Sequence, residues 1–144
     1  MKTRVQALKD SLAPAELEGY IVANESSMLY FTGSTGAAGF WVPLDGENIL
    51  YSYGVNFESV KATAKNCRVE LLKRNENPFE KITESIEPLG LKGIGFDALN
   101  AVYYLKLRMK IKGTNIIVQH IQASSIRNSS LIFSRPSSVI CRNP

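Results

Sequence analysis

The fold is decided by two short apolar runs and the turn between them, Gly39-Phe40-Trp41-Val42-Pro43-Leu44-Asp45-Gly46-Glu47-Asn48-Ile49-Leu50-Tyr51. Residues 39–42 and 49–51 are rich in the aromatic and branched side chains that pack well in strands. Asp45-Gly46 supplies the positive φ that tight hairpin turns need. The stretch therefore predicts two strands that pair antiparallel.

Helices and strands alternate on either side of this hairpin. Apolar residues recur at helical spacing, and predict helices, at residues 5–12, 57–64, 79–86 and 101–109. Short apolar runs predict further strands at residues 20–22, 69–72, 94–96 and 115–118. Because strands joined by helices pair in parallel whereas the hairpin is antiparallel, the order αβββαβαβαβ predicts an α/β fold. We expect a mixed, six-stranded sheet with helices on both faces.

Asn77-Pro78-Phe79-Glu80 marks the start of the third helix. Asparagine is a common N-cap residue, proline fits the first helical position, and a glutamate at the third position can reach back to the cap amide. The sequence therefore predicts a helix that begins at Pro78.

The composition is that of a folded domain. Of the 144 residues, 44% are hydrophobic and 21% are charged, which argues against disorder, a coiled coil and a disulfide scaffold. We expect one domain over residues 1–123. The first residues lack the apolar core of a signal peptide, and no apolar run reaches the length that spans a bilayer. The two cysteines, Cys67 and Cys141, lie far apart, so we expect free thiols in a cytoplasmic protein.

Charge is unevenly spread along the chain. Residues 1–97 carry all thirteen acidic residues and ten of the seventeen lysines and arginines, so the net charge of +4 arises in residues 98–144. A basic segment can attract nucleic acid. Four of its seven bases fall on one predicted helix, for which we favour a solvated helix face over a binding patch: Lys106, Arg108, Lys110 and Lys112.

The sequence offers no set of residues for catalysis or metal binding. A two-metal hydrolase needs several converging carboxylates and usually a histidine, but His120 is the only histidine and no acid follows Asp97. A Ser-His-Asp or Cys-His arrangement would have to use the same His120. We interpret Asp45 as part of the hairpin turn and Asp97 as a cap for the amides of the helix that follows it.

One glycine-rich stretch, residues 33–39, could offer backbone amides to an anion. It lacks the lysine of a phosphate-binding P-loop and leads into a strand instead of a helix. We therefore expect a connection before the strand, and no cofactor bound to this chain.

Several short motifs, taken in order, resemble the N-terminal domain of the creatinase, prolidase and aminopeptidase P family. Gly19-Tyr20-Ile21-Val22 is followed by Ser27-Met28-Leu29-Tyr30-Phe31-Thr32-Gly33 and then by the hairpin, and the likeness covers residues 1 to 120. Tyr30-Phe31-Thr32-Gly33 is similar to the family's Tyr-Leu-Thr-Gly at the end of a short helical turn. Gly95-Phe96-Asp97 before a helix is similar to a second landmark. Ser27 departs from the asparagine that the family often has three residues before the tyrosine, which leaves the helix cap open.

This resemblance implies a mixed sheet with a ribonuclease H-like motif, in a non-catalytic domain of an Xaa-Pro metallopeptidase. In that family a larger second domain binds two divalent metals, such as Mn, Co or Zn, through aspartates, a histidine and glutamates in that order. No acid follows His120, so we expect the catalytic domain to be absent and the chain alone to be inactive.

The resemblance also implies partners and a site. It implies contacts with a second copy in a homodimer, or with a catalytic domain of the family, and a wall of the cleft that admits proline-containing peptides. The candidate cleft-edge motif consists of Tyr30, Phe31, Thr32 and Gly33. No catalytic, cofactor-binding or metal-binding residue is assigned.

Residues 124–144 form a serine-rich, acid-free tail where the family would have a charged linker helix. A truncation or a shifted reading frame would each explain this tail. Leu131-Ile132-Phe133 or Val139-Ile140 could hold it by packing on this or a neighbouring molecule.

Two other functions remain open from the sequence. The chain could be a stand-alone peptide- or protein-binding or assembly module that uses its sheet edge or glycine loop and has no hydrolase activity. It could also bind nucleic acid through the basic C-terminal third, which we favour least. We expect no membrane partner.

Overall fold

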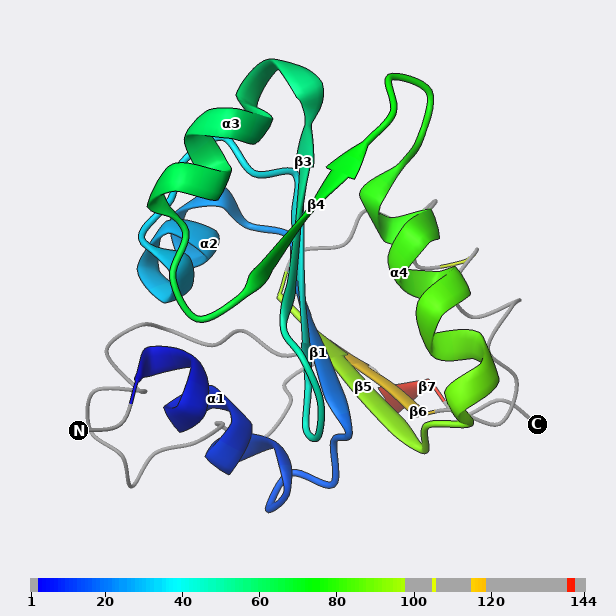
Figure 1. Ribbon diagram of the computed structural model, residues 1–144. Coiled ribbons are helices and arrows are strands. Elements are labelled where there is room, and N and C mark those ends of the chain that lie inside the picture. The colour runs from blue at the N-terminus through cyan, green and yellow to red at the C-terminus, as the bar shows by residue number, and fades with distance from the viewer. Residues whose placement is uncertain (1–2, 98–104, 106–114, 119–139, 142–144) are drawn as a thin grey trace.

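The computed structural model describes residues 3–97, 105, 115–118 and 140–141 (Figure 1). Its helices and strands are, in chain order, α1 (Arg4–Leu12), β1 (Gly19–Val22), α2 (Glu25–Thr32), β2 (Gly39–Pro43), β3 (Ile49–Tyr53), α3 (Gly54–Thr63), β4 (Arg68–Leu72), α4 (Pro78–Ile86), the 3₁₀ turn η1 (Glu87–Leu89), β5 (Gly93–Phe96), β6 (Asn115–Val118) and β7 (Ile140–Cys141).

The strands form one mixed sheet in the order β4-β3-β2-β1-β5-β6-β7. β2 pairs antiparallel with both β1 and β3, as the predicted hairpin requires. β4 lies parallel to β3, while β5 is parallel to both β1 and β6. The α/β class and the mixed sheet are therefore confirmed.

In the part of the chain that the structure describes, the sheet has seven strands, one more than the predicted six. The additional strand, β7, lies in the segment that we expected to be a tail, and it pairs antiparallel with Ile116 and Ile117 of β6. A two-residue strand is too short to show an alternating pattern, so sequence periodicity could not reveal it.

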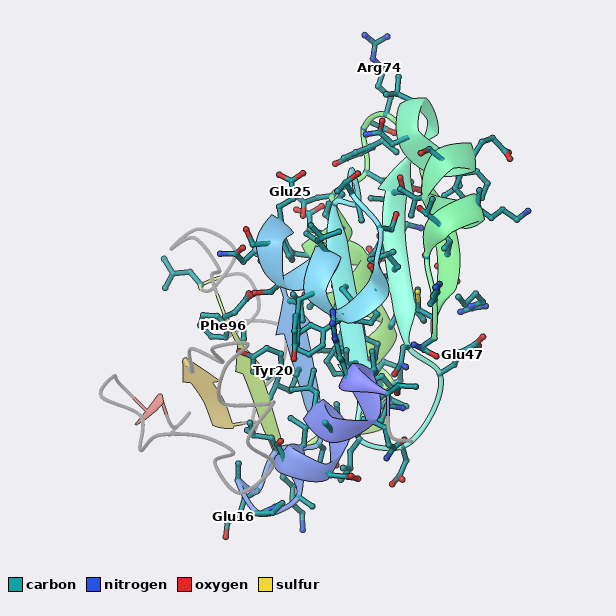
Figure 2. The ribbon with its side chains drawn as sticks, turned by 90° about the vertical axis from the view of Figure 1, so that its left-hand side faces the viewer. Glu16, Tyr20, Glu25, Glu47, Arg74 and Phe96 are labelled. Atoms are coloured by element: carbon teal, nitrogen blue, oxygen red, sulfur yellow. The ribbon has the colours of Figure 1, made fainter. Side chains whose placement is uncertain are left out.

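Helices cover both faces of the sheet, as predicted (Figure 1). α1, α2 and α3 lie on one face and α4 lies on the other. Figure 2 looks onto the face that carries the first three helices. Because successive strand residues point to opposite faces, Tyr20 and Val22 of β1 pack under α1 and α2 whereas Ile21 packs under α4.

The predicted apolar stripes of two helices are buried. Val5, Leu8 and Leu12 of α1 are almost entirely removed from solvent, as are Ile82 and Ile86 of α4. The predicted helix along residues 101–109 lies outside the described residues except for Leu105, which is helical and exposed.

The predicted start of α4 is confirmed. The Asn77 side chain accepts a hydrogen bond from the Phe79 amide at 2.9 Å, and Pro78 occupies the first turn. Proline sacrifices no hydrogen bond at this position, because the first backbone amides of a helix have no acceptor within the helix.

The hairpin turn has the predicted backbone conformation. Gly46 has a φ of +116°, which is the region that favours glycine. Lys9 of α1 donates a hydrogen bond to the Gly46 carbonyl at 2.8 Å, and burial lowers the pKa of Lys9 although Asp45 lies nearby. The turn is thus fixed to the first helix.

Gly19, the first residue of β1, has no room for a side chain. A Cβ atom at this position would lie 2.0 Å from an atom of the Trp41 indole ring. Trp41 is buried on the α4 side of the sheet. Its ring covers the backbone of the neighbouring strand, and this close approach requires glycine.

We predict that Gly19→Ala destabilises the fold by about 1–3 kcal/mol, because the buried Trp41 ring must move to admit the methyl group. Urea denaturation measures the loss. Gly54→Ala is the matched control, since its Cβ would meet only the end of Leu71 at 3.9 Å. Equal stabilities for the two variants would contradict this packing.

Candidate functional site

Helix α2 carries the candidate motif, and its N-terminus is fixed by two side chains. The Asn24 side-chain oxygen accepts hydrogen bonds from the Ser26 amide at 2.9 Å and the Ser27 amide at 3.4 Å. The Asp97 carboxylate accepts from the Ala23 amide at 2.7 Å and the Asn24 amide at 3.2 Å. Asp97 follows β5, so it joins the end of that strand to the turn between β1 and α2.

These contacts settle the helix cap that the sequence left open and show a contact of Asp97 that the sequence did not predict. Ser27 lies inside α2, and Asn24 serves as the cap, so the departure at Ser27 leaves the cap intact. The helix that we expected Asp97 to cap lies outside the described residues. Within them, the buried Asp97 carboxylate accepts hydrogen bonds from two amides just before α2, 73 and 74 residues earlier. Sequence could not show this, because β5 becomes a neighbour of β1 only in the folded sheet.

The other end of α2 is closed by Thr32 and Gly33. Gly33 has a φ of +74°, and its amide donates to the Leu29 carbonyl at 2.8 Å. This is the left-handed helix end that glycine favours. The buried Thr32 hydroxyl donates to the Met28 carbonyl at 2.7 Å and accepts from the Ser34 amide at 3.3 Å. Thr32 and Gly33 therefore both take part in ending this helix.

The same end of α2 is bonded to the segment that follows α3. The Thr32 carbonyl accepts from the Lys65 amide at 2.9 Å. The hydroxyls of Ser34 and Thr63 lie 2.8 Å apart and share a hydrogen bond. These contacts hold the start of the glycine-rich stretch in place.

The two aromatic residues of the motif point in different directions. Phe31 is buried in the core under α1 and α2, whereas Tyr30 is half-buried. Their rings meet edge to face, with centroids 5.3 Å apart. Phe31 thus anchors the motif and Tyr30 borders the surface.

Arg4 of α1 lies over this surface. Its guanidinium is 4.3 Å from the Tyr30 ring centre, and its Nη1 donates to the Tyr30 carbonyl at 2.9 Å. A cation over an aromatic ring is attracted to the ring face. The contact joins the start of α1 to the end of α2.

A pocket of about 440 Å³ opens at this junction. It is lined by Thr3, Arg4, Tyr30, Phe31, Thr32, Gly33, Lys65 and Asn66. The lining thus includes all four residues of the candidate motif together with two cationic side chains and no acidic one. Such a lining can attract a carboxylate or another anionic group.

Sequence reasoning found the motif but missed the other half of the pocket. Arg4 lies at the first position of α1, where a positive charge opposes the helix dipole. Asn66 has a φ of +64°, which is uncommon for a residue other than glycine. The unfavourable charge at Arg4 was the one signal visible in the sequence.

The glycine-rich stretch crosses from this motif to β2. The Asn56 side-chain amide donates to the Gly36 carbonyl at 3.2 Å, and the Ala38 amide donates to the Tyr51 carbonyl at 2.8 Å. Gly36 also has a positive φ of +86°. The stretch is a connection before a strand, as expected, and these bonds define its path.

Side chains of the types that bind metal ions do not cluster in the described part of the chain. No group of three or more His, Cys, Asp or Glu side chains that could hold a metal ion occurs among residues 3–97, 105, 115–118 and 140–141. These residues do not supply the ligand set of a two-metal centre. His120 and the basic segment Lys106 to Lys112 lie outside the described residues.

Cys67 is half-buried, and burial raises the pKa of its thiol to about 11. A thiol with so high a pKa stays protonated near neutral pH, and the protonated form is a poor nucleophile. Cys67 is therefore a protonated, weakly nucleophilic thiol under these conditions.

Comparison with known protein families gives one decisive match. The sequence model of the creatinase/prolidase N-terminal domain matches residues 4–128, which is most of the chain. The chain belongs to the creatinase/prolidase N-terminal domain family. The resemblance drawn from its short motifs is thereby confirmed.

Solved structures share the fold of this creatinase/prolidase domain. A proline dipeptidase from Streptococcus pneumoniae matches with a TM-score of 0.70 and 20% identity, over 91% of this chain and 99% of that one. The N-terminal domain of the cytoplasmic peptidase PepQ from Mycobacterium tuberculosis matches with a TM-score of 0.71 and 16% identity, over 88% and 97% of the two chains.

A third structure belongs to a longer protein. The Xaa-Pro dipeptidase from Bacillus anthracis matches with a TM-score of 0.67 and 16% identity, over 86% of this chain but 37% of that one. No curated protein sequence matches this chain. In the part of the chain that the structure describes, no helix is long and apolar enough to cross a membrane.

We predict that Gly33→Val destabilises the domain by about 1–2 kcal/mol, because a branched side chain is strained at a φ of +74°. Space is not the cause, since a Cβ here would lie 4.0 Å from the nearest atom, the Thr63 carbonyl oxygen.

Gly33→Asn is the matched control for this prediction. Asparagine adopts the left-handed region more readily, so its loss should be clearly smaller. Urea denaturation of both variants measures the difference. Equal losses would show that the left-handed helix end does not determine the choice of glycine.

Proposed function

We propose that this domain is the non-catalytic part of an Xaa-Pro peptidase-like protein. In this role it contributes subunit contacts and one wall of the active-site cleft, and the catalytic unit beside it binds two divalent metals such as Mn, Co or Zn. The observation that carries the proposal is the match to the Bacillus anthracis Xaa-Pro dipeptidase. The fold of this domain accounts for 37% of that chain, which leaves a larger part beside it.

The candidate cleft edge is the motif from Tyr30 to Gly33 with the stretch that follows it. Restricting a cleft requires loops held by a rigid sheet, and several contacts hold this edge. Phe31 anchors it in the core, Thr32 and Gly33 fix the helix end, and Asn56 holds Gly36. The exposed Thr35 lies between these fixed points.

The substrates of the full enzyme would be proline-containing peptides, and the protein would work in the cytoplasm as a homodimer. The similarity to proline dipeptidases supports the substrate class, and the similarity to a peptidase described as cytoplasmic supports the location. The domain itself would position the peptide and exclude longer chains without taking part in bond cleavage.

The pocket supports a second candidate function. Arg4 and Lys65 line it together with the motif, so the domain could act as a stand-alone module that binds the carboxylate of a peptide or protein partner. Binding of this kind would not depend on a metal ion, whereas hydrolysis by the full enzyme would.

The proposal is tested by joining this chain to the catalytic part of the Bacillus anthracis dipeptidase in place of its matching 37%. We predict that Thr35→Trp in this fusion lowers kcat/KM for peptides longer than dipeptides by about tenfold, because a bulky side chain narrows the cleft. Dipeptide hydrolysis should change little.

Two controls accompany this assay. Glu84→Trp changes an exposed residue of α4 on the opposite face of the sheet, so it should leave kcat/KM unchanged. The unfused chain with added manganese should give no Xaa-Pro hydrolysis. Turnover by the unfused chain that survives repurification, or equal effects of the two tryptophans, would contradict the proposed function.

A further inference from the structure

Strand β4 forms one edge of the sheet, and none of the strands that the structure describes pairs with its outer side. It is the last strand in the order β4-β3-β2-β1-β5-β6-β7. In Figure 1 it crosses in front of the sheet with no helix or strand drawn over it. An edge strand presents backbone groups that can pair with another chain.

The backbone orientation of β4 follows from one hydrogen bond. The Arg68 amide donates to the Asn48 carbonyl at 2.8 Å, so Arg68 directs its backbone groups toward β3. Because this direction alternates along a strand, Glu70 also faces β3. Cys67, Val69 and Leu71 direct their amides and carbonyls toward the open edge.

The side chains of this edge do not protect it against pairing. β4 contains no proline, and Leu71 is 54% exposed. Its two charges have opposite signs, and the Arg68 guanidinium pairs with Glu70 at 2.8 Å and with Glu47 at 3.5 Å. In Figure 2 Glu47 projects from the side of the molecule on which β4 lies. The edge therefore repels neither a neutral strand nor a copy of itself.

We propose that a second copy of this chain pairs its β4 antiparallel with this β4, around a two-fold axis that passes beside Val69. The inference rests on the homodimer of the proposed function and gives it a defined interface. In this register Val69 faces Val69 of the second copy in a hydrogen-bonded pair. Arg68 of each copy then lies opposite Glu70 of the other.

Charge selects this register over its neighbours. An axis at Arg68 would place two arginines opposite each other, and an axis at Glu70 would place two glutamates together. Like charges directly opposite each other destabilise a pair of strands, and opposite charges stabilise it. Only the axis at Val69 gives two opposite-charge pairs, and these occupy the closer, non-hydrogen-bonded positions.

The apolar residues agree with this arrangement. Cys67 and Val69 pack against the core on the α3 side, and Leu71 lies near Gly54 at the start of α3. The two-fold axis places the α3 sides of both copies on the same side of the joined sheet. The exposed Leu71 of one copy therefore lies beside Cys67 of the other. The two sheets join into one continuous sheet, as in other strand-addition complexes.

The register is tested by cysteine cross-linking in the full chain with Cys67→Ala and Cys141→Ala. We expect Val69→Cys to form a covalent dimer on mild oxidation, because Cα atoms of a hydrogen-bonded pair lie about 5.5 Å apart, within disulfide range. Leu71→Cys in the same background should not, because the two introduced thiols would be about four positions apart, roughly 13 Å along the strand.

The charge pairs are tested by sedimentation equilibrium. Arg68→Glu and Glu70→Arg should each weaken self-association about tenfold or more, and an equimolar mixture of the two should restore it through complementary pairs. Glu84→Arg on α4 is the control for net charge. Thermal melting of each variant shows whether its monomer is intact.

Failure of the interface and failure of the homodimer give different results. A dimer that Val69→Cys does not cross-link, or that Leu71→Cys cross-links equally well, would overturn the β4 interface and leave the homodimer in place. A chain that stays monomeric up to millimolar concentration would overturn both.

Discussion

The structure depends on the complete burial of β1. This strand has neighbours on both edges, β2 on one side and β5 on the other, and helices cover both of its faces. All four of its residues are buried. Gly19 admits the Trp41 ring and Gly95 of β5 admits Tyr20 and Leu17, so these side chains lie directly over the strand backbone because two positions carry no side chain.

The candidate site is built outward from this strand. The buried Asp97 carboxylate holds the amides of Ala23 and Asn24 where β1 turns into α2. Hydrogen bonds from charged acceptors are stronger than neutral ones, and an amide pair left without its acceptor would be costly. α2 then delivers Tyr30, Phe31, Thr32 and Gly33 to the junction with α1. The position of the motif thus follows from the position of β1.

Much of this could be predicted from the sequence, because local signals agreed with the final fold. The hairpin around Gly46, the capped start of α4 at Asn77 and the apolar stripe of α1 each have a pattern contained in a few neighbouring residues. The features that could not be predicted join distant segments. Asp97 contacts residues 73 and 74 positions earlier, and Arg4 contacts Tyr30, 26 positions later. Such contacts exist only after the sheet has formed.

The two proposals place different demands on the same sheet. A cleft edge at the end of α2 requires a motif that does not move relative to β1, whereas self-association requires an outer strand that can accept a partner. The fold assigns these demands to different strands, since four strands lie in order from β1 to the edge at β4, although Lys65 and Asn66 of the pocket directly precede β4. A rigid centre can therefore coexist with an edge that is free to pair.

Hydrogen exchange of the backbone amides tests most directly whether β1 is that rigid centre. In dilute protein, where pairing at β4 is weak, the amides of Tyr20, Ile21 and Val22 should exchange only through global unfolding and show the highest protection. The Arg68 and Glu70 amides of β4 should exchange through smaller, local openings. Protection in β1 that is equal to or lower than in β4 would contradict the account.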